Sequence, residues 1–120
     1  MTIAHQRRKY FRLKTDNKLK HTKFSFFSGD ILSGEAISKD LSVGGLLFES
    51  RHLYRLEEVI RIEMNIPGVS IGHTGMIVAL GKVVRLEIIS AGCYEIGVSF
   101  VGIDSEHQTA LRQYIQRQIA

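Results

Sequence analysis

The middle of the chain alternates between apolar and polar residues, one position at a time. In residues 59–66 (VIRIEMNI) an apolar side chain falls on every second position, and residues 94–100 (YEIGVSF) repeat this period. A period of two in a half-polar segment is typical of antiparallel strands with one buried face. The expected core-facing residues are Ile60, Ile62, Met64 and Ile66 in the first segment and Tyr94, Ile96, Val98 and Phe100 in the second.

Residues 75–89 predict a longer strand with an irregularity near its centre. Apolar positions before and after Gly81 are in phase with one another. A glycine within a strand is a usual place for a bulge or a bend, so we expect the strand to curl there. The residues in phase are Met76, Val78 and Leu80 before the glycine and Val84, Leu86 and Ile88 after it.

Three more strands are expected in the first half of the chain. Residues 19–27 predict a weaker strand, followed by a turn at 28–34. Residues 35–41 and 45–50 flank a short polar turn. Six short strands with turn-rich joints predict a mainly β protein, either a small barrel or a sandwich.

The C-terminal segment changes to a helical period. Asp104 or Ser105 is a capping residue, and Leu111, Ile115 and Ile119 follow at four-residue steps with Tyr114 beside them. This stripe predicts an amphipathic helix over 104–119. We expect the helix to cover one side of the strands, and partner binding is the alternative.

Length and composition indicate one globular domain. The chain has 120 residues, of which 44% are hydrophobic and 23% charged, which is enough for a real core. The single Cys93 forms no internal disulfide, and no apolar run is long enough to span a membrane. The first ten residues also lack the apolar stretch of a signal peptide. We therefore expect a cytoplasmic protein without membrane insertion.

The net charge of +4 favours an anionic partner, and its distribution says more than its size. Between residues 7 and 23, Asp16 is the single acidic residue among many basic ones. These cations are Arg7, Arg8, Lys9, Arg12, Lys14, Lys18, Lys20 and Lys23.

Catalysis and metal binding have no support in the residues. The five histidines lie far apart, none has a cysteine at a metal-ligand spacing, and we expect them at the surface or half buried. Ser42 lacks the preceding glycine of a nucleophile elbow, because Asp40 stands at that position. We predict no enzyme, no metal and no cofactor.

The segment RRKYFR at 7–12 is the first candidate for binding chemistry. Arg8 and Arg12 are separated by three residues, and Arg7 precedes them. The arginine fork matches phosphate oxygens and the O6/N7 edge of guanine. The alternative is a solvated basic run.

The segment DLSVGG at 40–45 is the second candidate. Asp40 and Ser42 share one side of an extended chain, and Gly44 and Gly45 permit a tight turn or a close approach of the backbone to a ligand. A carboxylate accepts hydrogen bonds from N1–H and the exocyclic amine of guanine, and the serine hydroxyl supports it. The alternative is a connecting turn in which both side chains bond their own backbone. Together the two segments describe a guanine nucleotide site without metal or phosphate loop.

These segments resemble the paired Arg-x-x-x-Arg and Asp/Asn-x-Ser-x-x-Gly signature of PilZ domains. Residues 81–87 (GKVVRLE), residues 95–100 (EIGVSF) and the terminal helix are also similar to that family, from about residue 6 onward. The resemblance implies a six-stranded antiparallel β-barrel with a C-terminal helix that binds the bacterial second messenger cyclic di-GMP.

The resemblance also implies roles for the motif residues. Arg8 and Arg12 would hold guanine and phosphate, Asp40 and Ser42 would bind a guanine edge, and Gly45, beside Gly44, would let the backbone approach. In the family an arginine placed like Arg7 is linked with two intercalated ligand molecules. Tyr10 and Phe11 depart from the small residue or proline that is frequent there. We expect them to anchor the arm on the barrel, and stacking on a base is the alternative.

The expected organisation is a flexible basic arm, residues 1–12, and a barrel domain, residues 13–120. The arm is charged and terminal, so we expect it to be loose until ligand folds it against the 40–45 turn and makes a surface for a downstream protein. One alternative is an interaction module of this fold without ligand. A less favoured one is a nucleic-acid-binding barrel, because the adjacent Phe26 and Phe27 cannot both face one groove.

Overall fold

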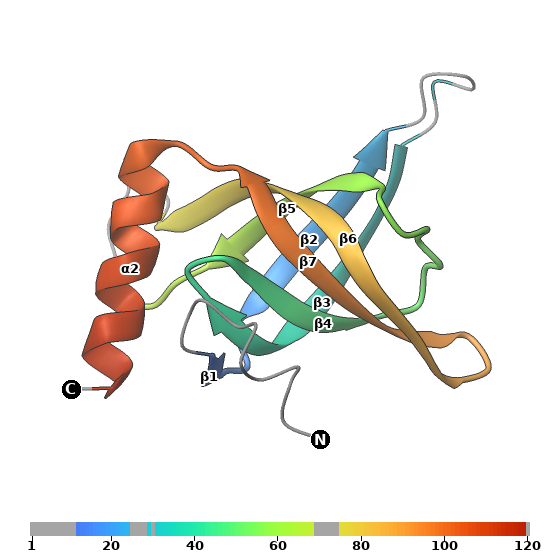
Figure 1. Ribbon diagram of the computed structural model, residues 1–120, viewed down its shortest axis with the longest axis horizontal. Helices are drawn as coiled ribbons and strands as arrows, with labels where there is room; N and C mark the ends of the chain where they lie inside the picture. The colour runs from blue at the N-terminus through green and yellow to red at the C-terminus, as the bar shows by residue number, and fades with distance from the viewer. Residues whose placement is uncertain (1–11, 25–28, 30, 69–74, 120) are drawn as a thin grey trace.

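The structure is a computed structural model that describes residues 12–24, 29, 31–68 and 75–119. Antiparallel strands make up most of it, and one helix follows them at the C-terminus (Figure 1). The strands are β1 (Leu13–Lys14), β2 (Lys18–Phe24), β3 (Ile31–Ser42), β4 (Gly45–Ser50), β5 (Val59–Asn65), β6 (Met76–Ser90) and β7 (Cys93–Gly102). The helix is α2 (Ser105–Ile119).

The strands close into a barrel. Their order is β1-β3-β2-β5-β6-β7-β4, and an additional pairing of β3 with β4 joins the two ends of the sheet. The short β1 lies on the same side of β3 as β2, since β1 pairs with the end of β3 and β2 with its beginning. The expected six-stranded antiparallel barrel with a C-terminal helix is therefore confirmed.

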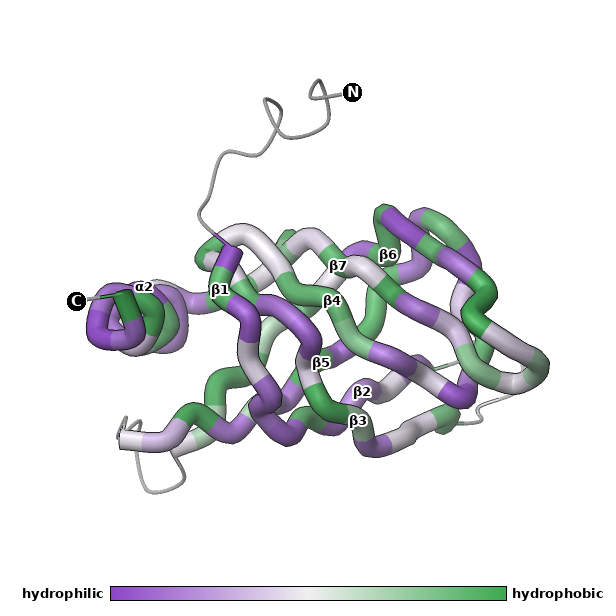
Figure 2. Tube along the Cα trace, turned by 90° about the horizontal axis from the view of Figure 1, so that it is seen from below, coloured by the Kyte–Doolittle hydropathy of each residue, from purple (hydrophilic) through white to green (hydrophobic). Residues whose placement is uncertain are grey.

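The alternating segments bury the faces that the sequence predicted. Ile60, Ile62 and Met64 of β5 are almost fully buried, as are Ile96 and Val98 of β7. Hydrophobic and hydrophilic positions alternate along these strands in Figure 2. The barrel core is thus built from the period-two pattern, as expected for strands with one face turned inward.

In β6, by contrast, the phase seen in the sequence does not mark the core. Ile77, Ala79 and Val83 are buried, whereas Val84 and Ile88 are exposed. The register against β7 shifts between Leu80 and Gly81, again between Val83 and Arg85, and a third time near the strand end. The irregularity expected near Gly81 is present, but its extra residue is Val101 of β7, because Leu80 pairs with Gly102 and Gly81 with Phe100. The buried positions keep one phase across Gly81, and only after the shift at Val84, where β6 itself carries the extra residue, does Leu86 pack against the core.

The turn expected at 28–34 is wrong for residues 31–34, which belong to β3. Thr22 pairs with Ser33 and His21 with Gly34 across β2 and β3. Local glycine and aspartate signals favour a turn, and the long-range strand pairing overrides them. The expected strand 19–27 is confirmed to Phe24, and residues 25–27 lie outside the described residues.

A bulge at Lys39 divides β3 into two parts. Ser38 and Leu41 are both buried although three positions separate them, and the register against β4 shifts between Ser38 and Asp40. One extra residue in the strand explains this, because side chains otherwise alternate strictly between the two faces. Before the bulge even-numbered side chains face inward, and after it Leu41 does.

Helix α2 stands across one end of the barrel (Figure 1). The Asp104 carboxylate accepts a 2.9 Å hydrogen bond from the backbone N–H of His107, so Asp104 is the N-cap. Leu111, Tyr114 and Ile115 are buried against the strands, whereas Ile119 is exposed. The predicted helix and its packing against the barrel are confirmed.

One histidine departs from the expected exposure. His21 is almost fully buried, with its ring 5.0 Å from that of Phe48. Its Nδ1 lies 2.5 Å from the Tyr54 hydroxyl, which is also buried. His21 is therefore a core residue with a satisfied polar atom, since period-two placement on β2 carries it inward.

Candidate ligand-binding site

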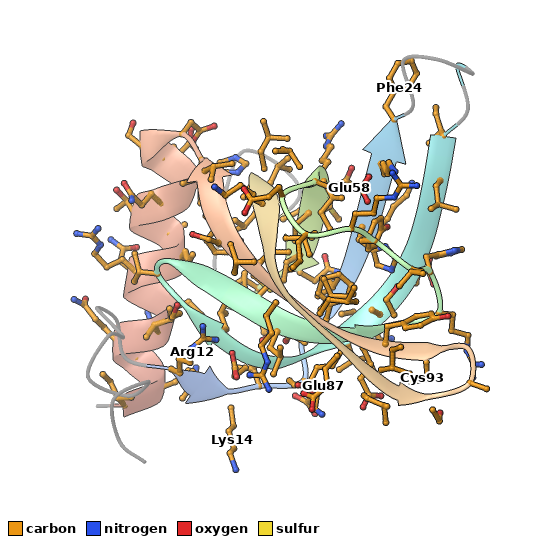
Figure 3. The ribbon with its side chains drawn as sticks, turned by 45° about the vertical axis from the view of Figure 1, so that its right-hand side comes forward. Arg12, Lys14, Phe24, Glu58, Glu87 and Cys93 are labelled. Atoms are coloured by element: carbon orange, nitrogen blue, oxygen red, sulfur yellow. The ribbon has the colours of Figure 1, made fainter. Side chains whose placement is uncertain are left out.

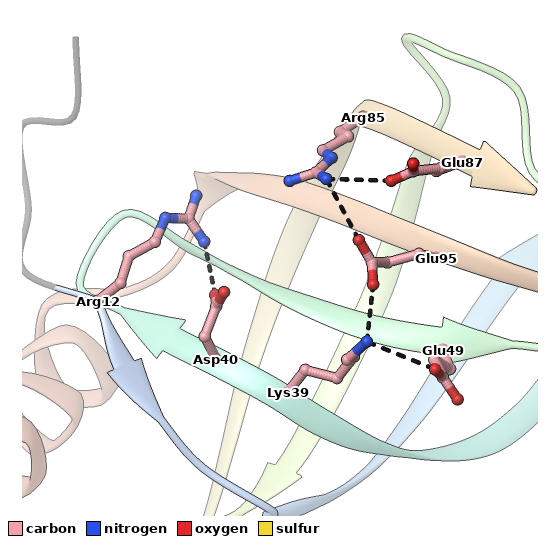
Figure 4. A network of polar contacts seen from close by, with 7 residues as sticks. All are labelled: Arg12, Lys39, Asp40, Glu49, Arg85, Glu87 and Glu95. Atoms are coloured by element: carbon pink, nitrogen blue, oxygen red, sulfur yellow. Dashed lines mark hydrogen bonds and ion pairs between the residues drawn. The ribbon is translucent and has the colours of Figure 1, made fainter. Parts of the chain in front are cut away.

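Arg12 and Asp40, one from each of the two polar segments, form an ion pair. Arg12 Nη1 lies 2.6 Å from Asp40 Oδ1, and the two side chains are 32% and 19% exposed (Figure 4). The pairing of β1 with β3 places them, because Leu13 faces Leu41 and Lys14 faces Asp40. The structure thus joins segments that are 28 positions apart. Arg7 and Arg8 lie outside the described residues.

Ser42 holds the turn between β3 and β4. It is only 3% exposed, and its Oγ accepts a hydrogen bond from Gly44 N–H (3.2 Å) and donates one to the carbonyl oxygen of Gly45 (3.3 Å). This arrangement matches the connecting-turn alternative for the serine, while Asp40 bonds to Arg12 rather than to its own backbone. One lone pair of the hydroxyl oxygen is left by these contacts.

Gly44 and Gly45 fit the turn tightly against β7. The carbonyl of Gly44 accepts a 2.8 Å hydrogen bond from Phe100 N–H. A Cβ added at Gly45 would stand 2.0 Å from the carbonyl oxygen of Val98. A side chain at position 45 is therefore excluded by strand packing, whether or not a ligand approaches the backbone there.

A buried carboxylate beside this site was missed in the sequence. Glu95 on β7 binds Lys39 Nζ at 2.8 Å through Oε2 and Arg85 Nη2 at 3.4 Å through Oε1 (Figure 4). The hydrogen bond to Glu95 raises the pKa of Lys39 above its ordinary value, and Glu49 adds to this. Residue 95 occupies a polar position in an alternating strand, so only the pairing of β4, β7 and β6 around it shows that it is buried.

Four strands contribute one row of paired residues between the Arg12–Asp40 ion pair and the cluster around Glu95. Asp40 pairs with Leu47, Leu47 with Gly97, and Gly97 with Arg85. Position 97 has little room for a side chain, since a Cβ there would lie 3.0 Å from Cβ of Arg85. The site therefore offers a carboxylate beside one arginine and, across Leu47 and the buried Gly97, a second arginine. Such a surface suits an anionic ligand that also carries hydrogen-bond donors.

In the part of the chain that the structure describes, no three His, Cys, Asp or Glu side chains are grouped to hold a metal ion. None of its helices has the length and apolarity needed to cross a membrane.

A closed six-stranded antiparallel barrel with one C-terminal helix defines the class of this chain as a small β-barrel domain. The family model of the PilZ domain matches residues 6–117. The chain belongs to the PilZ domain family.

Solved structures show the same fold. The Bacillus subtilis inhibitor of motility MotI/DgrA superposes with a TM-score of 0.70 at 20% identity, over 95% of this chain and 52% of that one. The PilZ domain of YcgR from Escherichia coli with c-di-GMP gives 0.67 at 18% identity, over 95% of both chains. The MrkH–c-di-GMP complex of K. pneumonia gives 0.68 at 15% identity, over 95% of this chain and 53% of that one. The chain therefore spans about half the length of MotI/DgrA and MrkH. No curated protein sequence matches it significantly.

Proposed function

We propose that this chain is a cyclic di-GMP receptor domain that passes the signal to a partner protein. The observation that carries the proposal is the 2.6 Å ion pair between Arg12 and Asp40, which unites the two signature segments at one site. Membership in the PilZ family and the c-di-GMP in the solved YcgR and MrkH structures support it.

The chemistry assigns each side chain a part of the ligand. Arg8 and Arg12 donate to phosphate oxygens and to the O6/N7 edge of guanine. Asp40 accepts from N1–H and the exocyclic amine. Ser42 contributes by holding the turn that positions Asp40. Gly44 and Gly45 leave the backbone of the turn bare for the ligand.

Binding in this proposal reorganises the N-terminal arm. Residues 1–12 close over the 40–45 turn when their arginines engage the phosphates, and this closure creates the surface that a downstream protein recognises. Arg7 supplies the extra positive charge that a second, intercalated ligand molecule requires, since two ligands bring four phosphates. The domain acts by binding and carries out no reaction.

Calorimetric titration tests the proposal. Cyclic di-GMP, with GTP and cyclic di-AMP as controls, is added to the purified chain, and selective binding at micromolar or lower ligand concentration is expected. The stoichiometry separates one ligand from an intercalated pair. Absence of heat at high protein concentration would reject the receptor and favour an interaction module without ligand.

Arg12→Ala and Arg8→Ala give the site-specific test. Each removes a two-pronged contact worth roughly 1–3 kcal/mol, so affinity is expected to fall about 5- to 150-fold. Arg117→Ala is the matched control, because Arg117 donates to the Gly68 carbonyl on the helix side and should leave affinity unchanged. Unchanged affinity in both site variants contradicts the assignment. Steep salt dependence without preference for the cyclic dinucleotide indicates the nucleic-acid alternative.

A further inference from the structure

The first half of β3 has a neighbour on one side only. Residues 31–37 pair with β2, and β4 joins the other side of β3 only from Ser38 onward, as far as the described residues show. The Ser38 N–H donates to the Asn17 carbonyl at 2.9 Å, on the β2 side. Because backbone groups alternate along a strand, the odd-numbered residues before Ser38 turn theirs to the open side. These residues are Ile31, Ser33, Glu35 and Ile37.

The edge is open because β4 ends and turns away from β3. Ser50 Oγ accepts a hydrogen bond from His52 N–H and donates one to the His52 carbonyl, both at 2.9 Å, which turns the chain. A notch of about 370 Å³ remains between the diverging segments. Gly34 and Glu35 line it on the β3 side, and residues 49–52 line it opposite. There is therefore space beside the backbone of β3.

In the part of the chain that the structure describes, this edge lacks the usual protection against pairing. Sheet edges in soluble proteins commonly carry several charges, prolines or a covering segment. Here Glu35 is the single charged residue between 31 and 37. Ile31 and Ile37 are 67% and 53% exposed on the outer face, and the β2–β3 hairpin projects from the barrel (Figure 1). Figure 3 shows Phe24 at the far end of this hairpin, well away from Arg12. An exposed apolar strand edge is a site for strand addition.

The sequence of the edge is symmetric in chemical class. ILSGEAI, residues 31–37, has Gly34 at its centre, a polar residue on each side of the glycine, and apolar residues beyond them. A strand of this kind is complementary to a second copy of itself placed antiparallel. We infer that two copies of this chain associate through β3, edge to edge, around a twofold axis at Gly34.

The pairing fits both side chains and backbone. The pairs are Ile31 with Ile37, Leu32 with Ala36, Ser33 with Glu35, and Gly34 with Gly34, the second residue of each belonging to the second copy. Apolar residues thus meet apolar ones, and the only charge meets a hydroxyl rather than a like charge. All odd-numbered residues pair with odd-numbered ones, so every hydrogen-bonded pair uses backbone groups that face the open side.

Gly34 suits the axis for a second reason. Residues on the axis form a pair without hydrogen bonds, in which the two Cα atoms approach to about 4.5 Å. A side chain is already excluded inside the protomer, because a Cβ at Gly34 would lie 2.8–2.9 Å from the His21 and His52 rings. The same isologous contact on both copies closes the assembly as a dimer and leaves no further β3 edge.

Charge substitutions at Ser33 test the inference with the full chain. The twofold axis gives the dimer two equivalent Ser33–Glu35 pairs, one in each direction. Ser33→Lys should therefore lower the dimer dissociation constant and Ser33→Glu raise it, each about 2- to 30-fold. Thr109→Lys and Thr109→Glu, on an exposed position of α2, make the same change in net charge and should leave the dimer constant unmoved. Sedimentation over a concentration series measures the constants.

Ser33→Pro is the second variant. Its N–H faces the open side, so proline there should keep the β2–β3 pairing and remove the dimer bonds. Retained cooperative thermal unfolding shows that the variant is folded, and its dimer constant should weaken about tenfold or more. A chain that stays monomeric up to millimolar concentration overturns the inference, as does a dimer that is insensitive to all three Ser33 variants.

Discussion

The two halves of β3 differ in how many neighbours they have. Residues 38–42 lie between β1 and β4, carry Asp40 and Ser42, and bury Leu41 completely. Among the described residues, 31–37 pair only with β2, and Ile31 and Ile37 are exposed. A strand held on both sides gives a side chain a fixed position, which a binding site needs, whereas a strand with a free edge offers its backbone. One strand thus offers fixed side chains in one half and backbone groups in the other.

The largest loss of stability is expected for a methyl group added at Gly45, which follows residues 38–42, the half of β3 that is paired on both sides. Gly45→Ala forces Cβ against the Val98 carbonyl oxygen, 2.0 Å away, so β4 and β7 must separate. We expect a loss of about 4 kcal/mol in the free energy of unfolding, measured by urea denaturation. Ser33→Ala, on the free edge, should change it by less than about 0.5 kcal/mol. A stable Gly45→Ala variant would contradict the packing explanation.

Acid should lower the stability of the fold through the buried His21 of β2, which pairs with Gly34 in the first half of β3. Burial, with a smaller effect of His52, lowers the pKa of His21 from 6.5 to about 4. Below about pH 6.5 the unfolded chain takes up a proton that the folded chain refuses until about pH 4. Stability should therefore fall by about 3 kcal/mol as pH drops through this window, with no effect of this residue above it.

His21→Asn separates this contribution from that of the carboxylates. The asparagine amide can take the place of Nδ1 beside the Tyr54 hydroxyl but does not titrate. The variant should show a shallower decline in unfolding free energy between pH 6.5 and 4 than the natural chain. Parallel pH profiles of the natural chain and the variant would mean that the pKa of His21 is the same in the folded and unfolded states.

The smallest loss of stability is expected at Ser38, where the two halves of β3 meet. Its Oγ accepts a hydrogen bond from the buried Asn17 N–H at 3.1 Å and lies 2.6 Å from Thr15 Oγ1. Ser38→Ala removes that acceptor, although the Asn17 carbonyl keeps its bond to Ser38 N–H. We expect a loss of about 1–2 kcal/mol in unfolding free energy, against little for Ser33→Ala. Equal values for the two serines would remove the distinction between the halves.

The sequence predicted those parts of the molecule that depend on local period. Strands around residues 59–66 and 94–100 and the helix over 104–119 follow from side chains that alternate or recur every fourth position. The class of fold and the pairing of the two polar segments came from motif and resemblance. Arg12 and Asp40 are indeed brought together, although their roles toward a ligand remain proposals to be tested.

What local period cannot supply is the register between strands. The turn expected at 28–34 is replaced over residues 31–34 by pairing with β2, and the buried positions of β6 before residue 84 have the opposite phase to the expected one. Glu95 occupies a polar position, and only its neighbours on β4 and β6 show that it is buried among cations. His21 was expected nearer the surface for the same reason.

The extra residue at Lys39 decides which way the carboxylate of Asp40 points. With strict alternation from Ser38, position 40 would face the core, and the bulge turns Asp40 outward to Arg12 instead. The site therefore depends on the length of this segment as much as on its composition. Deleting Lys39 would restore strict alternation and leave Asp40 facing outward, whereas one residue more between Ser38 and Lys39, with the bulge kept, would keep every motif residue in order and still direct the carboxylate of Asp40 into the barrel. Comparisons that align the motif letters alone would miss such a loss, because it is a change of frame rather than of residue.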